Sequence, residues 1–142
     1  MVSPNIEDYL EHIHIFTRKE QRPVKTTELA NLLGVKPAAV TGMAKKLSSE
    51  GYIIYEPYVG IKLDEKGELI ARKILRKHLI IEHFLVDCLG VDLKDACNEA
   101  CKLEHSMSDD TIERLYVYMK KPATCPHGEK IEKAFPDEKN KE

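Results

Sequence analysis

The 142-residue sequence predicts a mainly α-helical protein with two domains. Apolar residues recur at helical spacing through most of the chain, and Gly or Pro residues separate the helical stretches. One β-branched stretch in the first half predicts a short hairpin. The chain is 42% hydrophobic and 32% charged, which is ordinary for a soluble globular protein. No apolar run approaches the roughly 20 residues that span a bilayer, so a transmembrane helix is excluded.

Three helices and a hairpin are expected in the first half. Thr26 is the expected cap of the second helix, and Gly34 ends it. Pro37 begins the third helix, because the first helical turn tolerates proline, and Gly51 ends it. The expected helices cover residues 5–19, 26–33 and 37–50, and the hairpin strands cover residues 52–55 and 61–63.

The second half is predicted to be helical. A long helical pattern runs from residue 64 to 88, with Gly90 after it, and a fifth helix covers residues 93–105. Ser108 caps a sixth helix that continues to Met119. The tail after residue 128 is polar and charged, and no structure is assigned to it.

Two short helices joined by a glycine turn and followed by a hairpin are typical of a winged helix-turn-helix, which indicates DNA binding. Residues 18–50 hold seven Lys or Arg against three Asp or Glu, a balance that suits a polyanion. Small residues at the start of the third helix allow close approach to bases, and lysines would contact phosphates. The alternative is a structural helix with a solvated face, or a protein-interaction module. The DNA-contacting candidates are Lys25, Lys36, Pro37, Ala38, Ala39, Thr41, Gly42, Lys45, Lys46 and the wing-tip Tyr58.

Potential metal ligands share helix faces in the rest of the chain. Pairs at i, i+3 or i, i+4 project to one side of a helix, and mixed N, O and S donors suit a divalent transition metal. A His–Glu pair alone is more often a surface ion pair, a lone Cys101 is more often a buried thiol, and residues 125–127 could form a plain turn; the combination favours a metal. The sets are His78 with Glu82; Cys97, Cys101, Glu104 and His105; Asp8 with Glu11; and Cys125 with His127.

Residues 99–109, EACKLEHSMSD, resemble the metal-binding segment of the diphtheria toxin repressor family, which includes the manganese transport regulators. Residues 6–11, 35–41, 66–67 and 125–128 match as well, so the resemblance covers nearly the whole chain to Gly128. It implies a homodimeric repressor that binds operator DNA when Fe(II) or Mn(II) occupies its sites. It also implies a winged-helix domain at residues 1–71 and a helical metal-binding and dimerisation domain at residues 72–142. The SH3-like third domain of the longer members is expected to be absent.

The resemblance implies about two metal sites per subunit. One would use Asp8, Cys101, Glu104 and His105, with Glu11 close by; the other would use His78, Glu82, Cys125 and His127. Iron-type members have Met in place of Asp8 and a His ligand in place of Cys97, and manganese-type members usually have Glu in place of Cys101. Thiolates favour Fe(II), Zn(II) or Co(II), whereas carboxylates favour Mn(II). Fe(II) is slightly preferred, with Zn(II), Co(II) or Ni(II) possible in vitro, and the role of Cys97 is left open.

The sequence therefore predicts a metal-activated repressor of metal-homeostasis genes. The main alternative is a metal-independent or thiol-redox-responsive winged-helix regulator. An enzyme is not expected, since no catalytic motif is present and a DNA-binding domain would have no evident purpose. The acidic, polar N-terminus lacks a secretory signal, which predicts a cytoplasmic protein with no membrane or small-molecule substrate as partner. A dimer contact is expected on the sixth helix, at Ile112, Leu115, Tyr116 and Met119.

Overall fold

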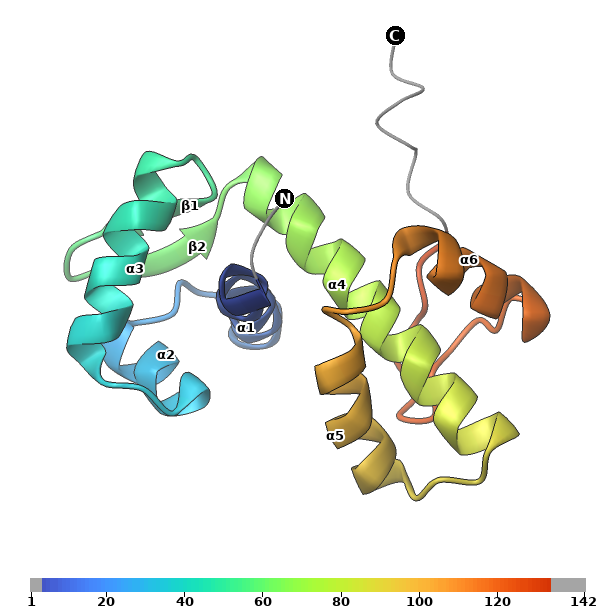
Figure 1. Cartoon of the computed structure of the whole chain (residues 1–142). Helices are drawn as coiled ribbons and strands as arrows, with labels where there is room; N and C mark the ends of the chain where they lie inside the picture. The colour runs from blue at the N-terminus through green and yellow to red at the C-terminus, as the bar shows by residue number, and fades with distance from the viewer. Residues whose placement is uncertain (1–3, 134–142) are drawn as a thin grey trace, which may run out of the picture. The chain divides into compact units, whose positions relative to one another are not determined.

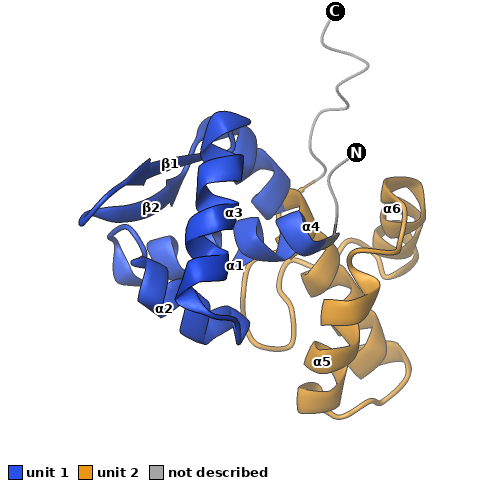
Figure 2. Cartoon of the chain, turned by 60° about the vertical axis from the view of Figure 1, so that its left-hand side comes forward, with its two compact units in different colours: residues 1–72 blue, residues 73–142 orange. Residues whose placement is uncertain are grey.

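The computed structural model describes residues 4–133 and is mainly helical, with one two-stranded sheet (Figure 1). The chain divides into two compact units, residues 1–72 and 73–142 (Figure 2). The elements are α1 (Pro4–Glu20), α2 (Thr26–Leu33), α3 (Pro37–Ser49), β1 (Ile53–Glu56), β2 (Gly60–Leu63), α4 (Glu65–His83), the π-helical segment η1 (Phe84–Cys88), α5 (Leu93–Leu103) and α6 (Asp109–Tyr118). None of the helices within residues 4–133 is long and apolar enough to cross a membrane. The predicted fold class is confirmed.

The first unit has one hydrophobic core. Leu10 and Ile13 of α1 are fully buried together with side chains from α2, α3 and both strands. The start of α4 closes this core, because Ala71 is completely buried in it. Gly67 lies so close to the Tyr52 carbonyl that an added Cβ would overlap it, and glycine is therefore required where α4 leaves the hairpin.

The turn between α2 and α3 has the expected chemistry. Gly34 adopts the left-handed conformation, with φ of 68°, and its amide donates to the Ala30 carbonyl. Pro37 occupies the first turn of α3. The predicted cap of α2 was one residue too late. Lys25 is the cap, and its amide donates to the carboxylate of Glu28 at 3.0 Å, so an acidic third residue replaces the expected threonine.

The hairpin is antiparallel, with Ile53 opposite Leu63 and Glu56 opposite Gly60. Val24 adds a bridge to Ile61, through two backbone hydrogen bonds of 2.8 and 2.9 Å. This bridge ties the segment before α2 to the wing. The tip carries Tyr58, which is fully exposed and has a φ of 68°.

The second unit has its own core. Ile80 and Ile81 of α4, Ala100 of α5 and Ile112 of α6 are at most 1% exposed. Cys125 and Ile131 of the following loop are also buried here, at 4% and 3% exposure. Ser108 caps α6 as predicted, since its hydroxyl accepts from the Thr111 amide. The apolar run at residues 84–86 predicts that the following Cys88 lies in the core. That prediction was wrong, because Cys88 ends η1 with its thiol exposed.

Packing and hydrogen bonds hold the loop after α6. The Cys125 amide donates to the Glu129 carbonyl and the Ile131 amide donates to the Ala123 carbonyl. Arg76, which is 5% exposed, forms an ion pair with Glu113 and donates from Nε to the Glu132 carbonyl at 2.8 Å. Residues 121–130 have almost no apolar content, which predicts that a metal and not packing holds this turn. The contacts of Arg76 and the burial of Ile131 show that packing does contribute.

Candidate metal centre and DNA-binding surface

The second unit contains a chain of alternating imidazoles and carboxylates. His78 of α4 stands at its middle: Nδ1 lies 2.9 Å from a Glu104 oxygen and Nε2 lies 3.2 Å from a Glu82 oxygen. The second oxygen of each carboxylate contacts another imidazole, His127 for Glu82 and His105 for Glu104. Both glutamates are 1% exposed. Because a buried carboxylate is costly without a positive partner, this arrangement calls for a cation.

In the absence of a metal ion, the proton of His78 supplies that positive charge. Burial alone would lower the pKa of His78, but hydrogen bonds with Cys101 and Glu104 and the Glu104 charge outweigh it and raise this pKa to about 12. The imidazole is therefore protonated at neutral pH. A divalent cation would replace this proton and would be bound by the same nitrogen and carboxylate groups.

Two thiols flank the same imidazole. Cys97 Sγ lies 3.7 Å from Nε2 of His78, and Cys101 Sγ lies 3.8 Å from Nδ1. They are one turn apart on α5, which places them on the face that packs toward α4. Burial raises the pKa of Cys97, so a metal at this position must also displace the thiol proton.

A second group of potential metal ligands lies at the Glu82 end of this row of imidazoles and carboxylates. Glu82, Cys125 and His127 bring a carboxylate oxygen, a thiol and an imidazole nitrogen within 4.8 Å of one another. Cys125 is buried and His127 is partly exposed, so the group opens to solvent on one side. This set of donors fits a divalent transition metal, and an open side would admit it.

Asp8 and Glu11 lie on α1 in the first unit. They are one helical turn apart, as the spacing predicts; Asp8 is half-buried and Glu11 is 5% exposed. Buried or half-buried acidic side chains are unusual, and these two are candidates for metal ligation from the first unit.

The structure groups the potential metal ligands of the second unit differently from the ligand sets that the resemblance implies. Glu82, Cys125 and His127 are together, as expected, but His78 lies between them and the α5 donors. Cys97, whose role the sequence left open, contacts His78 directly. Its spacing of one turn from Cys101 was the available signal, and only the packing of α5 against α4 shows that both thiols reach one imidazole.

Most of the residues predicted to contact DNA are exposed, on α3 and at the wing tip. Thr41 is half-buried and donates from its hydroxyl to the Pro37 carbonyl at 3.1 Å, whereas the other nine candidates are exposed. No Arg, Asn or Gln stands on this face of α3, so lysine–phosphate contacts are expected to dominate over base readout.

Replacing Lys45 and Lys46 with alanine should weaken binding to all DNA sequences alike. Each lost phosphate contact lowers the slope of log affinity against log salt by about 0.9. DNA affinity measured over a range of salt concentrations checks this. The matched control replaces Lys19 and Lys94, which are also exposed but lie outside the predicted DNA-contacting surface. If the salt dependence of DNA affinity is unchanged in both variants, α3 does not contact the DNA phosphate backbone.

Two family models match consecutive parts of the chain. Residues 1–61 match the N-terminal DNA-binding domain of the iron-dependent repressors, and residues 64–133 match their metal-binding and dimerisation domain. The chain belongs to the iron-dependent repressor family. The resemblance to the diphtheria toxin repressor and the manganese transport regulators is thus confirmed, and the protein is a metal-dependent, DNA-binding transcriptional repressor.

Relatives within the iron-dependent repressor family support this assignment. A helix-turn-helix transcriptional regulator of Methanocaldococcus jannaschii is 58% identical over 84% of this chain and 96% of its own length. The transcriptional regulator MntR of Bacillus subtilis is 35% identical over 81% of this chain and 80% of its own. The solved structure of the manganese regulator SloR superimposes with a TM-score of 0.80 and 34% identity, covering 93% of this chain. The chain spans only 61% of the SloR chain.

Proposed function

We propose that this protein represses transcription when Fe(II) or Mn(II) fills about two sites in each subunit, and that its targets are genes of metal-ion homeostasis. The observation that carries the proposal is the buried His–Glu chain around His78, in which two carboxylates at 1% exposure face the two nitrogens of one imidazole. The reading of DNA is assigned to residues 1–71, and metal binding and dimerisation to residues 72–142. The protein would act in the cytoplasm, on operator DNA.

Two ligand sets are proposed. The first joins Asp8, with Glu11 close by, to Cys101, Glu104 and His105; the second joins His78 and Glu82 to Cys125 and His127. Thiol and imidazole donors occur in both, and such donors favour Fe(II) over Mn(II). Asp8 and the glutamates suit Mn(II), and the similar structure of SloR is that of a manganese regulator by name. We therefore propose Fe(II) as the preferred ion and Mn(II) as its competitor.

The first set would connect the two functions of the protein. Asp8 belongs to α1, which is part of the DNA-binding core, whereas the other ligands belong to α5 and its end. A metal held by both would fix the orientation of the recognition helices. In a dimer their spacing must match half-sites about 34 Å apart or a multiple of it. The metal-free protein would sample other spacings, and its operator affinity would be reduced accordingly.

Asp8→Ala should therefore weaken metal-dependent operator binding and leave the dimer intact. The mutation removes a ligand from the DNA-binding side only, so the donors at Glu82, Cys125 and His127 remain. Operator affinity and sedimentation of the loaded protein are the measurements. Glu7→Ala is the control, one position earlier on α1. Equal operator affinity for the Asp8 and Glu7 variants would exclude Asp8 as the connecting ligand.

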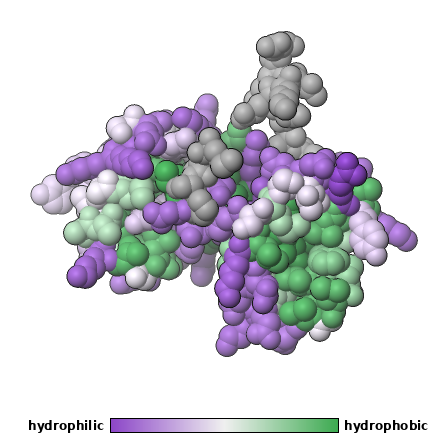
Figure 3. All heavy atoms as spheres, in the orientation of Figure 1, coloured by the Kyte–Doolittle hydropathy of each residue, from purple (hydrophilic) through white to green (hydrophobic). Residues whose placement is uncertain are grey.

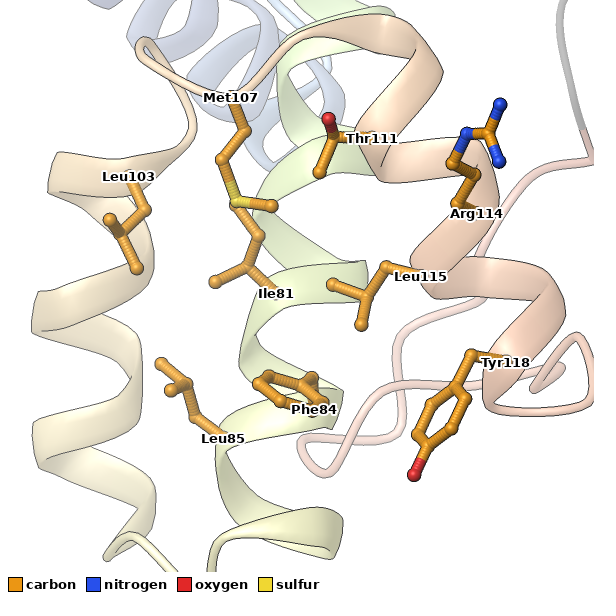
Figure 4. A pocket seen from close by; sticks show the side chains of 9 residues that line it. All are labelled: Ile81, Phe84, Leu85, Leu103, Met107, Thr111, Arg114, Leu115 and Tyr118. Atoms are coloured by element: carbon orange, nitrogen blue, oxygen red, sulfur yellow. The ribbon is translucent and has the colours of Figure 1, made fainter.

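A groove on the second unit is the proposed dimer contact. It has a volume of about 440 Å³ and is lined by Ile81, Phe84, Leu85, Leu103, Met107, Thr111, Arg114, Leu115 and Tyr118 (Figure 4). Hydrophobic side chains gather on this unit (Figure 3). The charge of Arg114 is balanced by Asp110, 2.9 Å away on the same helix, so a second copy would not be repelled. Ile112 and Tyr116, which the sequence suggested for this contact, are instead buried in the core of the unit.

Tyr118→Glu should convert the dimer to a monomer. Tyr118 is 74% exposed, so the change spares the core, but it puts a charge in each half of an apolar two-fold contact. Val117→Glu is the control, since Val117 is 59% exposed on the same helix and does not line the groove. Sedimentation at micromolar concentration gives the answer, and a dimeric Tyr118 variant would place the contact elsewhere.

The proposal is tested by operator binding with a panel of metals. An operator is first selected from fragmented genomic DNA with the Fe(II)-loaded protein under anaerobic conditions. Its affinity is then measured with Fe(II), Mn(II), Co(II) and Zn(II), each with and without chelator. We expect binding that Fe(II) or Mn(II) restores and chelator abolishes. Binding that ignores chelator and responds to oxidant would instead support a thiol-redox regulator.

A further inference from the structure

His78, at the centre of the His–Glu chain, forms a separate group of potential metal ligands with Cys97 and Cys101. The nearest nitrogens of His78 lie 3.7 Å from Cys97 Sγ and 3.8 Å from Cys101 Sγ, and one donor atom from each residue lies within 4.8 Å of the others. All three belong to α4 and α5 of the second unit, so the group does not depend on α1.

The two sulfur–nitrogen separations are close to those between ligands of one metal, although they involve different nitrogens of the His78 ring. In tetrahedral zinc sites the metal lies about 2.3 Å from sulfur and 2.0–2.1 Å from nitrogen, which puts neighbouring donors roughly 3.5–3.8 Å apart. One His78 nitrogen lies within 4.8 Å of both sulfurs, so a metal between the three donors would draw them closer together. A Glu104 oxygen, 2.9 Å from Nδ1, is in reach as the fourth ligand. The resulting set has two sulfurs, one nitrogen and one oxygen.

We propose that His78, Cys97 and Cys101 form a third metal-binding arrangement, closed by Glu104 and selective for thiophilic ions such as Zn(II). Two thiolates on one metal favour such ions over Fe(II) and strongly over Mn(II). The arrangement takes His78 from one proposed activating set and Cys101 and Glu104 from the other. It therefore excludes both activating sets while it is filled.

This arrangement gives the repressor a means of rejecting the wrong metal. The consequence rests on the proposed function, whereas the site itself does not. A zinc ion held entirely by α4 and α5 leaves Asp8 without its partners, so it cannot fix the DNA-binding unit. Zinc binds tightly by the general order of divalent-metal affinities. An arrangement that binds zinc without activating the repressor would leave activation to ions that bind more weakly, such as Fe(II) and Mn(II).

The site is tested by protection of thiols from alkylation. The full-length protein, kept reduced, is treated with iodoacetamide with and without one equivalent of Zn(II) per subunit, and the labelled cysteines are identified by mass spectrometry. We expect zinc to protect Cys97 and Cys101 together. Cys88, which is exposed outside the group, is the internal reference and should react equally in both samples.

Cys97→Ser and Cys88→Ser are the matched variants. Cys97→Ser should lower zinc affinity roughly 100-fold, the upper range for loss of a supporting partner, and release zinc inhibition of operator binding by the Fe(II)-loaded protein. Cys88→Ser should change neither, and circular dichroism confirms that both variants fold. Unprotected Cys97 in the presence of bound zinc would overturn the site. Protected Cys97 in a protein that no metal activates would keep the site and overturn the proposed function.

Discussion

Glu104→Gln should reduce operator binding by the metal-loaded protein to the level of the metal-free protein. Glu104 is 1% exposed and contacts His78 with one oxygen and His105 with the other. Glutamine has the same shape but lacks the charge, so a cation loses both a ligand and its main electrostatic compensation. Loss of a supporting partner alone costs 10–100-fold in metal affinity, and loss of the ligand should cost about 100-fold or more.

The control for this substitution lies on the same helix. Glu99 is exposed on α5, so Glu99→Gln makes an identical chemical change away from the centre. Metal affinity by competition with a chelator and operator affinity at saturating metal are both measured. If Glu104→Gln binds metal and operator as tightly as Glu99→Gln, the carboxylate at the centre of the second unit has no role in activation.

Metal affinity should rise steeply with pH. Because the pKa of His78 is raised to about 12, its imidazole carries a proton at neutral pH that an incoming metal must displace. Each displaced proton increases metal affinity about tenfold per pH unit. If Cys97 is a ligand, displacement of its thiol proton adds a further factor of about ten per pH unit. The same shift stabilises the metal-free fold. That contribution is complete below pH 6.5, the ordinary pKa of histidine, and is lost as the pH rises through about 12.

Two measurements check this linkage. Calorimetry in buffers of different ionisation enthalpy counts the protons released per metal, and His78→Gln should release one fewer than the wild type. Magnetic resonance of the metal-free protein reports the charge of the ring directly. A neutral His78 ring at neutral pH would remove the basis for the predicted slope.

Most of the fold could be predicted because local signals determine it. Gly34 and Pro37 fix the turn between α2 and α3 through their backbone preferences, and Ser108 fixes the start of α6 through its capping hydroxyl. The failures concern tertiary packing. The burial of Ile112 and Tyr116 depends on α4 and the final loop, and the exposure of Cys88 depends on η1. A helical period gives the apolar face of a helix but does not say whether the chain itself or a partner covers it.

The candidate site was predictable as a set of residues and less so as a geometry. Spacing on one helix identified His78 with Glu82, and Cys101 with Glu104 and His105, because neighbours three or four apart must share a face. Spacing cannot report which faces meet. The contacts of His78 with Glu104 and with both thiols cross between α4 and α5, and the salt bridge of Arg76 with Glu113 crosses to α6.

The central claim, that metal binding activates operator recognition, is tested most directly by one comparison. Affinity for the selected operator is measured at fixed salt for protein stripped by chelator and for the same protein reloaded with Fe(II). We predict tight binding only after reloading, with no difference between the two samples on DNA of unrelated sequence. Equal operator affinity for stripped and reloaded protein would contradict the account.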